Sequence, residues 1–90
     1  MVLKEVFSAL SDSTRLRILE MLREGDMTQK EIKERLEMDQ PAVSYHMDKL
    51  VRSGLVLAIK EGRQVRYSLN MGALDIILEY LMRLKKEGKS

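Results

Sequence analysis

The chain has 90 residues, of which 44% are hydrophobic and 33% are charged, and its formal net charge is +2. This balance is typical of a folded globular domain and excludes the polar, highly charged class of disordered chains. The absence of cysteine excludes disulfides, iron–sulfur clusters, thiolate metal sites and cysteine nucleophiles. A chain this short buries only about 60 to 65% of its unfolded surface, so we expect one domain over residues 1–90 that gains from contact with a partner.

No apolar run reaches the roughly 18 to 20 residues that a membrane-spanning helix needs. The first five residues also lack the basic stretch and apolar core of a signal peptide. The sequence therefore predicts a cytoplasmic protein with no membrane partner.

Basic residues are concentrated in the middle of the chain. Residues 1–39 carry seven Lys and Arg against nine Asp and Glu, whereas residues 40–69 carry five against two. A net charge of +2 is too small to indicate a nucleic-acid partner by itself, but a basic segment is where a phosphate-facing surface is expected. Residues 40–69 are therefore the first candidates for contact with nucleic acid.

Helical spacing predicts two helices in the first quarter of the chain. The first covers residues 2–10 and has an apolar face made of Leu3, Val6, Phe7 and Leu10. Asp12 or Ser13 then caps a second helix that ends at Gly25. Most charged residues of this helix, Arg15 among them, are expected to face water. Its expected buried stripe comprises Leu16, Leu19 and Leu22, with Ile18 and Met21 beside them.

The next two helices have clear start signals. Thr28 and Glu31 match the capping box, in which each side chain satisfies an amide at the beginning of a helix. The fourth helix follows a polar cap at Asp39 or Gln40 and has Pro41 in its first turn, where a missing amide proton costs nothing. Gly54 can close this helix. Its expected buried stripe comprises Val43, Met47, Leu50 and Val51.

After residue 54 the period of the apolar residues changes from about 3.6 to 2, which predicts a β-hairpin with its turn at residues 61–63. Asn70 then caps a final helix over residues 71–86. The apolar stripe of that helix comprises Leu74, Ile77, Leu78, Leu81 and Leu84. Four helices, two strands and a last helix make a mainly α fold with a small β-hairpin (α+β), in the order of a winged helix-turn-helix domain.

Three separated motifs resemble those of the ArsR family of arsenical-resistance repressors. They are residues 9–19 (ALSDSTRLRIL), residues 40–50 (QPAVSYHMDKL) followed by residues 54–56 (GLV), and residues 61–69 (EGRQVRYSL). The second is similar to the recognition helix of the family and the third to its wing. The resemblance covers residues 7–70 in the expected order. It implies a homodimer, built by the terminal helices 2–10 and 71–86, that binds a pseudo-palindromic operator as a transcriptional repressor.

The metal sites of the family have no counterpart in this sequence. Metal-sensing members carry a cysteine motif in or near the third helix, where this chain has residues 26–31 and no cysteine. A second family site uses Asp and His on the last helix, which here offers only Asp75 and Glu79. Because transition metals favour imidazole or thiolate ligands, these two carboxylates are interpreted as a solvated face. The sequence predicts no metal and no cofactor, and it identifies no effector.

The resemblance places the fourth helix in the major groove of double-stranded DNA. A groove about 12 Å wide admits one helix, and only side chains opposite its buried stripe reach the base edges. We expect Gln40, Ser44 and Tyr45 to read bases, although Gln40 could instead cap the helix and Ser44 could bond its own backbone. The expected phosphate and wing contacts are Lys49, Arg52, Lys60, Arg63, Gln64 and Arg66. Any one of these could be a solvated side chain, but their clustering favours DNA.

The only histidine, His46, is expected to pack or to form a hydrogen bond near the buried stripe. It cannot act as a base for Ser44, because residues two apart on a helix do not face each other. With no cysteine and no glycine-rich phosphate loop, the sequence shows no catalytic constellation. We therefore predict that the protein is not an enzyme.

The apolar faces of the two terminal helices predict a homodimer. The expected interface comprises Leu3, Val6, Phe7, Leu10, Leu74, Ile77, Leu78, Leu81 and Leu84. Some of these pack on their own domain, but together they exceed what a small monomer hides. Two recognition helices about 34 Å apart would contact successive major grooves of a two-fold symmetric site. The alternatives are a winged-helix module for protein–protein interaction, which the basic hairpin argues against, and a DNA-binding regulator of another winged-helix family.

Overall fold

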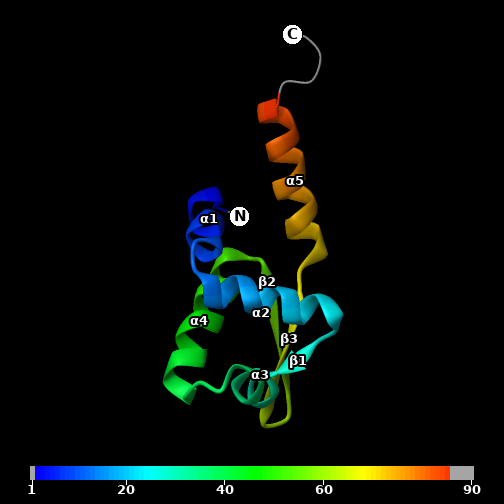
Figure 1. Ribbon diagram of the computed structural model, residues 1–90. Helices are drawn as coiled ribbons and strands as arrows, with labels where there is room; N and C mark the ends of the chain where they lie inside the picture. Colours follow the sequence, from blue (N-terminus) through cyan, green and yellow to red (C-terminus); the bar gives the residue numbers. More distant parts are fainter. Residues whose placement is uncertain (1, 86–90) are drawn as a thin grey trace.

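The structure is a computed structural model that describes residues 2–85 (Figure 1). Its elements are α1 (Leu3–Leu10), α2 (Ser13–Glu24), β1 (Met27–Thr28), α3 (Gln29–Leu36), α4 (Gln40–Ser53), β2 (Val56–Glu61), β3 (Gln64–Leu69) and α5 (Met71–Lys85). The predicted mainly helical α+β fold is confirmed, with one added strand. The predicted end of the last helix, residue 86, lies outside the described residues. None of the helices in residues 2–85 is long and apolar enough to cross a membrane.

The helices begin where the sequence predicts caps. Asp12, Asp39 and Asn70 each accept a hydrogen bond from the backbone amide three residues further on. The sequence left open Asp12 or Ser13 as the cap of α2 and Asp39 or Gln40 as the cap of α4. In the structure the caps are Asp12 and Asp39. Thr28 forms both bonds of the capping box at the start of α3. Gly54 ends α4 in the left-handed conformation, with a φ of 88° that favours glycine.

The sheet contains a strand that the sequence analysis missed. β1 pairs antiparallel with β3, so that Met27 lies opposite Tyr67, and the strand order is β1-β3-β2. A strand of two residues is too short to show alternation, which explains why periodicity did not detect it. Because α3 begins directly after β1, this pairing fixes the start of α3 against the hairpin.

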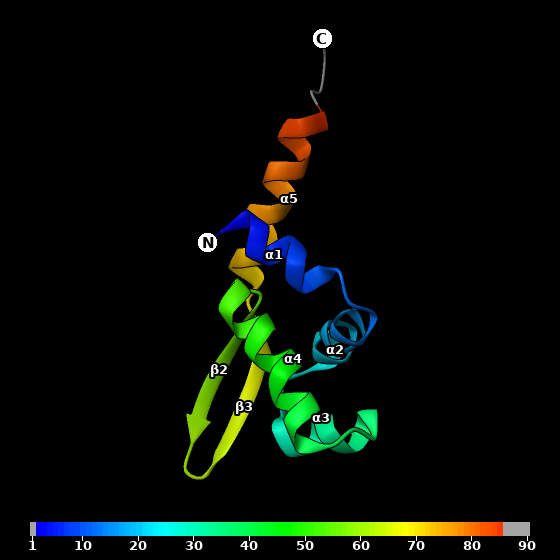
Figure 2. The ribbon, with the colours of Figure 1, turned by 90° about the vertical axis from the view of Figure 1, so that its left-hand side faces the viewer.

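The core lies between α1, α2, α3, α4 and the sheet (Figure 2). The predicted stripe of α4 is confirmed for Val43, Met47 and Leu50, each at most 1% exposed, whereas Val51 is only half-buried. The predicted face of α2 is partly wrong. Leu16 is 46% exposed, while Arg15 is only 6% exposed, because the buried stripe of α2 runs through positions 15, 18, 21 and 22. An arginine therefore occupies a position in the core face of this helix.

α5 extends away from the rest of the domain (Figure 1). α5 packs on the rest of the chain through Ala73, Leu74 and Ile77, and the ring of Tyr80 lies 6.4 Å from the ring of Phe7 on α1. Two residues predicted for the dimer interface, Val6 and Ile77, are instead buried in the core of their own chain. Their side chains already pack against neighbouring elements, so they cannot face a partner.

Candidate nucleic-acid interface

α3, the beginning of α4 and the turn between β2 and β3 lie together at one end of the domain (Figures 1 and 2). The far end of α5 lies at the opposite end. This arrangement follows from the short connections between α3 and α4 and from the β1–β3 pairing. The predicted recognition helix and the predicted wing therefore flank the same surface.

A cleft of about 380 Å³ lies between these three elements. Its lining comprises Thr28, Gln29, Lys30, Lys33, Gln40, Arg63, Gln64 and Val65. Three of these, Gln40, Arg63 and Gln64, are residues that the sequence predicted for DNA contact. The charged side chains of this lining, Lys30, Lys33 and Arg63, are all basic. A duplex phosphate backbone is the kind of partner that such a surface attracts.

The sequence analysis missed the contribution of α3 to this cleft. Lys30 and Lys33 are one turn apart and therefore share a face of the helix. A count of acidic and basic residues in this segment does not reveal the basic face, because Glu31 and Glu34 each directly follow one of the two lysines and balance their charge. The spacing of three residues was the signal that could have separated the basic face from the acidic one.

The three predicted base-reading residues differ in their surroundings. Gln40 is exposed at the first position of α4, and Asp39 rather than Gln40 caps the helix. Tyr45 is 56% exposed, and the ammonium of Lys49 lies 5.6 Å from the centre of its ring. Ser44 is half-buried, and its hydroxyl accepts a hydrogen bond from the side-chain amide of Gln29 at 3.0 Å. Thus Gln40 and Tyr45 are open to a ligand, and Ser44 is held by α3.

The remaining predicted phosphate contacts do not gather in the cleft. Lys49 and Arg52 lie toward the other end of α4, where they line a small hollow with Glu5 and Ser8 of α1. Lys60 is exposed near the end of β2. A helix rises about 1.5 Å per residue, so Arg52 lies roughly 18 Å along α4 from its first residue. These side chains could contact only a more distant part of a bound duplex.

Arg66, a predicted phosphate contact, has two carboxylate partners within its own chain. Its guanidinium forms an ion pair with Glu61 at 3.0 Å and a second ion pair with Asp26. The hydrogen bond that Arg66 donates to Glu61 raises the pKa of Arg66 further above its usual value, and the charges of Glu61 and Asp26 add to the effect. The side chain of Arg66 therefore joins β3 to the segment before β1, instead of offering a free charge.

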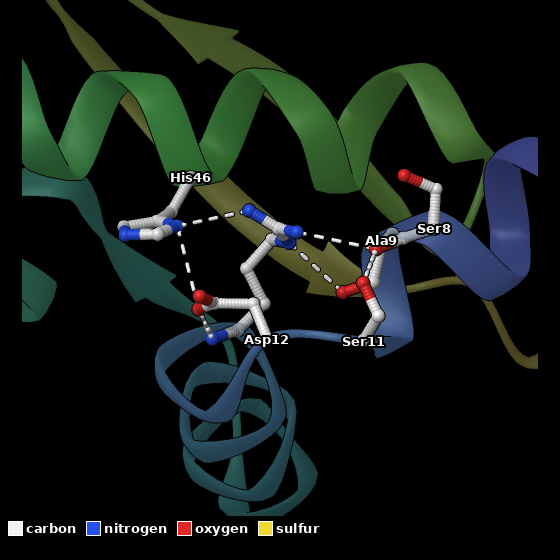
Figure 3. A network of polar contacts seen from close by, with 6 residues as sticks. Ser8, Ala9, Ser11, Asp12 and His46 are labelled. Atoms are coloured by element: carbon white, nitrogen blue, oxygen red, sulfur yellow. Dashed lines mark hydrogen bonds and ion pairs between the residues drawn. The ribbon is translucent and has the colours of Figure 1, made fainter.

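A polar network behind the surface joins α1, α2 and α4 (Figure 3). Arg15 donates to the carbonyls of Ala9 at 2.9 Å and Ser8 at 3.1 Å. Its Nη1 atom lies 3.2 Å from Nδ1 of His46, which in turn lies 3.7 Å from a carboxylate oxygen of Asp12. The predicted role of His46 in a hydrogen bond beside the buried stripe is confirmed.

The carboxylate of Asp12, which lies near His46, also caps the start of α2. It accepts the backbone N–H of Arg15, and this bond lowers the pKa of Asp12, helped by the nearby charges of His46 and Arg15. The ionised form of Asp12 is therefore the form that this network favours.

Among residues 2–85, no three His, Cys, Asp or Glu side chains come together in a group that could hold a metal ion.

Comparisons with known proteins agree with this architecture. Residues 12–57 match the family model described as bacterial regulatory protein, arsR family. The chain is 31% identical over 86 residues to the transcriptional repressor SdpR of Bacillus subtilis, covering 96% of each protein. It is 38% identical over 79 residues to the arsenical resistance operon repressor of Staphylococcus aureus, covering 88% of this chain and 76% of that protein.

The fold is also similar to that of solved regulators. The ArsR-like transcriptional regulator from Rhodococcus sp. RHA1 superposes with a TM-score of 0.84 at 35% identity, over 92% of this chain and 78% of that one. The family model, the relatives and the winged fold identify a DNA-binding transcriptional regulator and not an enzyme. This chain belongs to the ArsR family of bacterial regulatory proteins.

Proposed function

We propose that the chain is a homodimeric repressor that binds a two-fold symmetric operator in double-stranded DNA. The observation that carries this proposal is the cleft in which Gln40 of α4 meets Arg63 and Gln64 of the wing and the two lysines of α3. Relatives named as repressors support the direction of regulation. A regulator of this kind acts on bacterial DNA, and we therefore infer that the protein is located in the cytoplasm.

In the proposed complex, α4 lies in the major groove and the hairpin turn lies beside it. Gln40 and Tyr45 reach base edges, and Ser44 takes part from its position nearer the core. Arg63 follows the backbone or enters the minor groove. The α3 residues Lys30 and Lys33 neutralise phosphates on the near strand. Lys49, Arg52 and Lys60 contact phosphates further along the duplex.

The dimer is proposed from the uncovered apolar surface of the terminal helices. Phe7 of α1 and Leu78, Leu81 and Leu84 of α5 are all more than two-fifths exposed. α5 has further exposed apolar residues, which are Met71, Ile76 and Met82. A second copy related by a two-fold axis would bury the same face on both chains. Leu3, Leu10 and Leu74 are half-buried and would lie at the edge of that interface.

The test is a binding selection on random duplexes at two salt concentrations, combined with sedimentation of the free protein. We expect enrichment of an inverted repeat whose half-sites are about 10 to 10.5 base pairs apart, or a multiple of this, and a dimer at micromolar concentration. Enrichment of a single unrepeated half-site by a monomer would contradict the dimer. Absence of any duplex binding at low salt would overturn the DNA-binding role and favour a protein-interaction module.

A further inference from the structure

Three polar side chains from three different elements form a continuous relay beneath the cleft. The Tyr67 hydroxyl on β3 donates to Oε1 of Gln29 at 2.9 Å. Nε2 of Gln29, the first residue of α3, then donates to Oγ of Ser44 on α4 at 3.0 Å. The β1–β3 pairing creates this relay, because it places Met27 opposite Tyr67 and thus brings Gln29 over the phenol.

The two hydrogen bonds of the relay run in one direction, from Tyr67 to Gln29 and from Gln29 to Ser44. Tyr67 is only 7% exposed, and this burial raises the pKa of its phenol above the ordinary value, so the hydroxyl keeps its proton and can donate. A donor at this end holds the carbonyl oxygen of Gln29 toward β3 and its amide nitrogen toward α4. In this orientation Tyr67 and Gln29 are the donors, and the Ser44 hydroxyl accepts.

The direction of the relay determines what Ser44 can offer to a ligand. A serine hydroxyl has one hydrogen and two lone pairs. Because Gln29 donates to Ser44, a lone pair is used and the hydrogen stays free. Among residues 2–85, Gln29 is the partner that the structure gives to this hydroxyl. Ser44, one turn after Gln40 on α4, therefore has a hydrogen that it can donate to a ligand.

We propose that Gln29 is a specificity-positioning residue, which sets Ser44 as a hydrogen-bond donor toward one base pair of the operator. The favoured base edge then presents an acceptor, such as purine N7, guanine O6 or thymine O4, rather than an amino group. Gln29 itself does not contact the base. The inference rests on the proposed function in one respect, namely that α4 lies in the major groove.

The experiment is a binding selection on random duplexes with wild type, Ser44→Ala and Gln29→Glu. Ser44→Ala identifies the base pair that Ser44 faces, because preference is relaxed there alone. In Gln29→Glu the carboxylate accepts from both Tyr67 and Ser44, so the serine hydrogen turns inward and only lone pairs face the DNA. We expect preference at that base pair to move from acceptor edges toward the amino groups of adenine or cytosine, by about five- to tenfold.

Two further variants separate this effect from a change in charge or folding. Gln64→Glu adds the same charge to the same cleft away from Ser44, so it should weaken binding to all sequences by a similar factor. Tyr67→Phe adds no charge and removes the donor that orients Gln29. We expect it to reduce discrimination at the Ser44 base pair by about five- to tenfold and to leave the other positions unchanged.

The outcomes distinguish the relay from the function on which it rests. If Ser44→Ala changes no base preference, the proposed role of Ser44 and Gln29 is wrong. It is also wrong if Gln29→Glu and Tyr67→Phe leave the preferred base at that position unchanged. In both cases the operator-binding function stands. If wild type selects no sequence at all, the proposed function fails and the relay fails with it. A shift toward acceptor edges in Gln29→Glu would show that the amide has the opposite orientation, which also overturns the inference.

Discussion

The guanidinium of Arg15 and the imidazole of His46 lie in contact, with Nη1 of the arginine 3.2 Å from Nδ1 of the histidine. The same guanidinium holds two carbonyls at the end of α1 (Figure 3). Arg15 belongs to α2 and His46 to α4, so one side chain joins three helices. It connects the terminal helix proposed for the dimer with the helix proposed for DNA.

Arg15→Ala should lower the free energy of unfolding by about 2 to 3 kcal/mol, because it removes a buried, charged hydrogen-bonding group and with it the donor to the Ala9 carbonyl. Urea denaturation followed by circular dichroism measures this. The matched control is Arg17→Ala on the same helix, whose side chain is exposed and should matter by about 0.5 kcal/mol or less. Equal losses in the two variants would contradict the structural role of the network.

Asp12→Asn should reduce the loss of stability in acid. The folded-state pKa of Asp12 lies below its ordinary value of 3.8, so its ionised form stabilises the fold above that pH. This stabilisation is lost as the pH falls from the ordinary value through the lower folded value. Asparagine keeps a cap acceptor but does not titrate. Denaturation midpoints between about pH 5 and 2 should therefore fall less steeply than in wild type, whereas Asp75→Asn on the exposed side of α5 should keep the wild-type slope.

Arg66→Met and Arg63→Met should affect DNA binding differently. Arg66 is paired with Asp26 and Glu61, so its removal should leave the salt dependence of binding nearly unchanged and lower stability only slightly. Arg63 lines the cleft, and its removal should reduce the slope of log K against log salt by about one. Binding isotherms from about 50 to 200 mM salt measure both slopes. A loss of slope in Arg66→Met would restore its predicted phosphate contact.

The double variant Lys30→Gln, Lys33→Gln should weaken binding by a similar factor on specific and scrambled duplexes. Two phosphate contacts are removed, so the salt slope should decrease by about two. Fluorescence anisotropy on both duplexes gives the affinities. Lys4→Gln is the control, because Lys4 is exposed on α1, away from the cleft. A double variant with wild-type affinity would remove α3 from the interface.

Leu81→Asp should convert the dimer into a monomer at micromolar concentration. Leu81 is exposed on α5, so a carboxylate there leaves the core of the chain intact but would be buried without a partner in the dimer. Sedimentation velocity reports the association state, and operator affinity should fall by at least about tenfold because two linked half-sites become one. Glu79→Gln, on the polar side of the same helix, should remain dimeric. A monomeric wild type would overturn the proposal itself.

The sequence alone determined the order of the five helices and the hairpin, the helix starts to within a residue, and the resemblance to the family. A helix cap depends on residues at most three positions apart, and apolar periodicity depends on residues of one element. Both signals can therefore be recognised without a tertiary structure. The capping box at Thr28 and the glycine after α4 were predicted for this reason. The family motifs are likewise continuous stretches of chain.

Only the tertiary structure decided which polar groups meet. Arg15 and His46 are 31 residues apart, Gln29 and Tyr67 are 38 apart, and Asp26 and Arg66 are 40 apart. Each of these side chains has several possible partners, and packing selects one by bringing it within about 3 Å. The same packing buries Arg15, which was expected at the surface, and gives Arg66, a predicted phosphate contact, two carboxylate partners. Local signals specify the elements, whereas long-range pairing specifies which charges remain free for DNA.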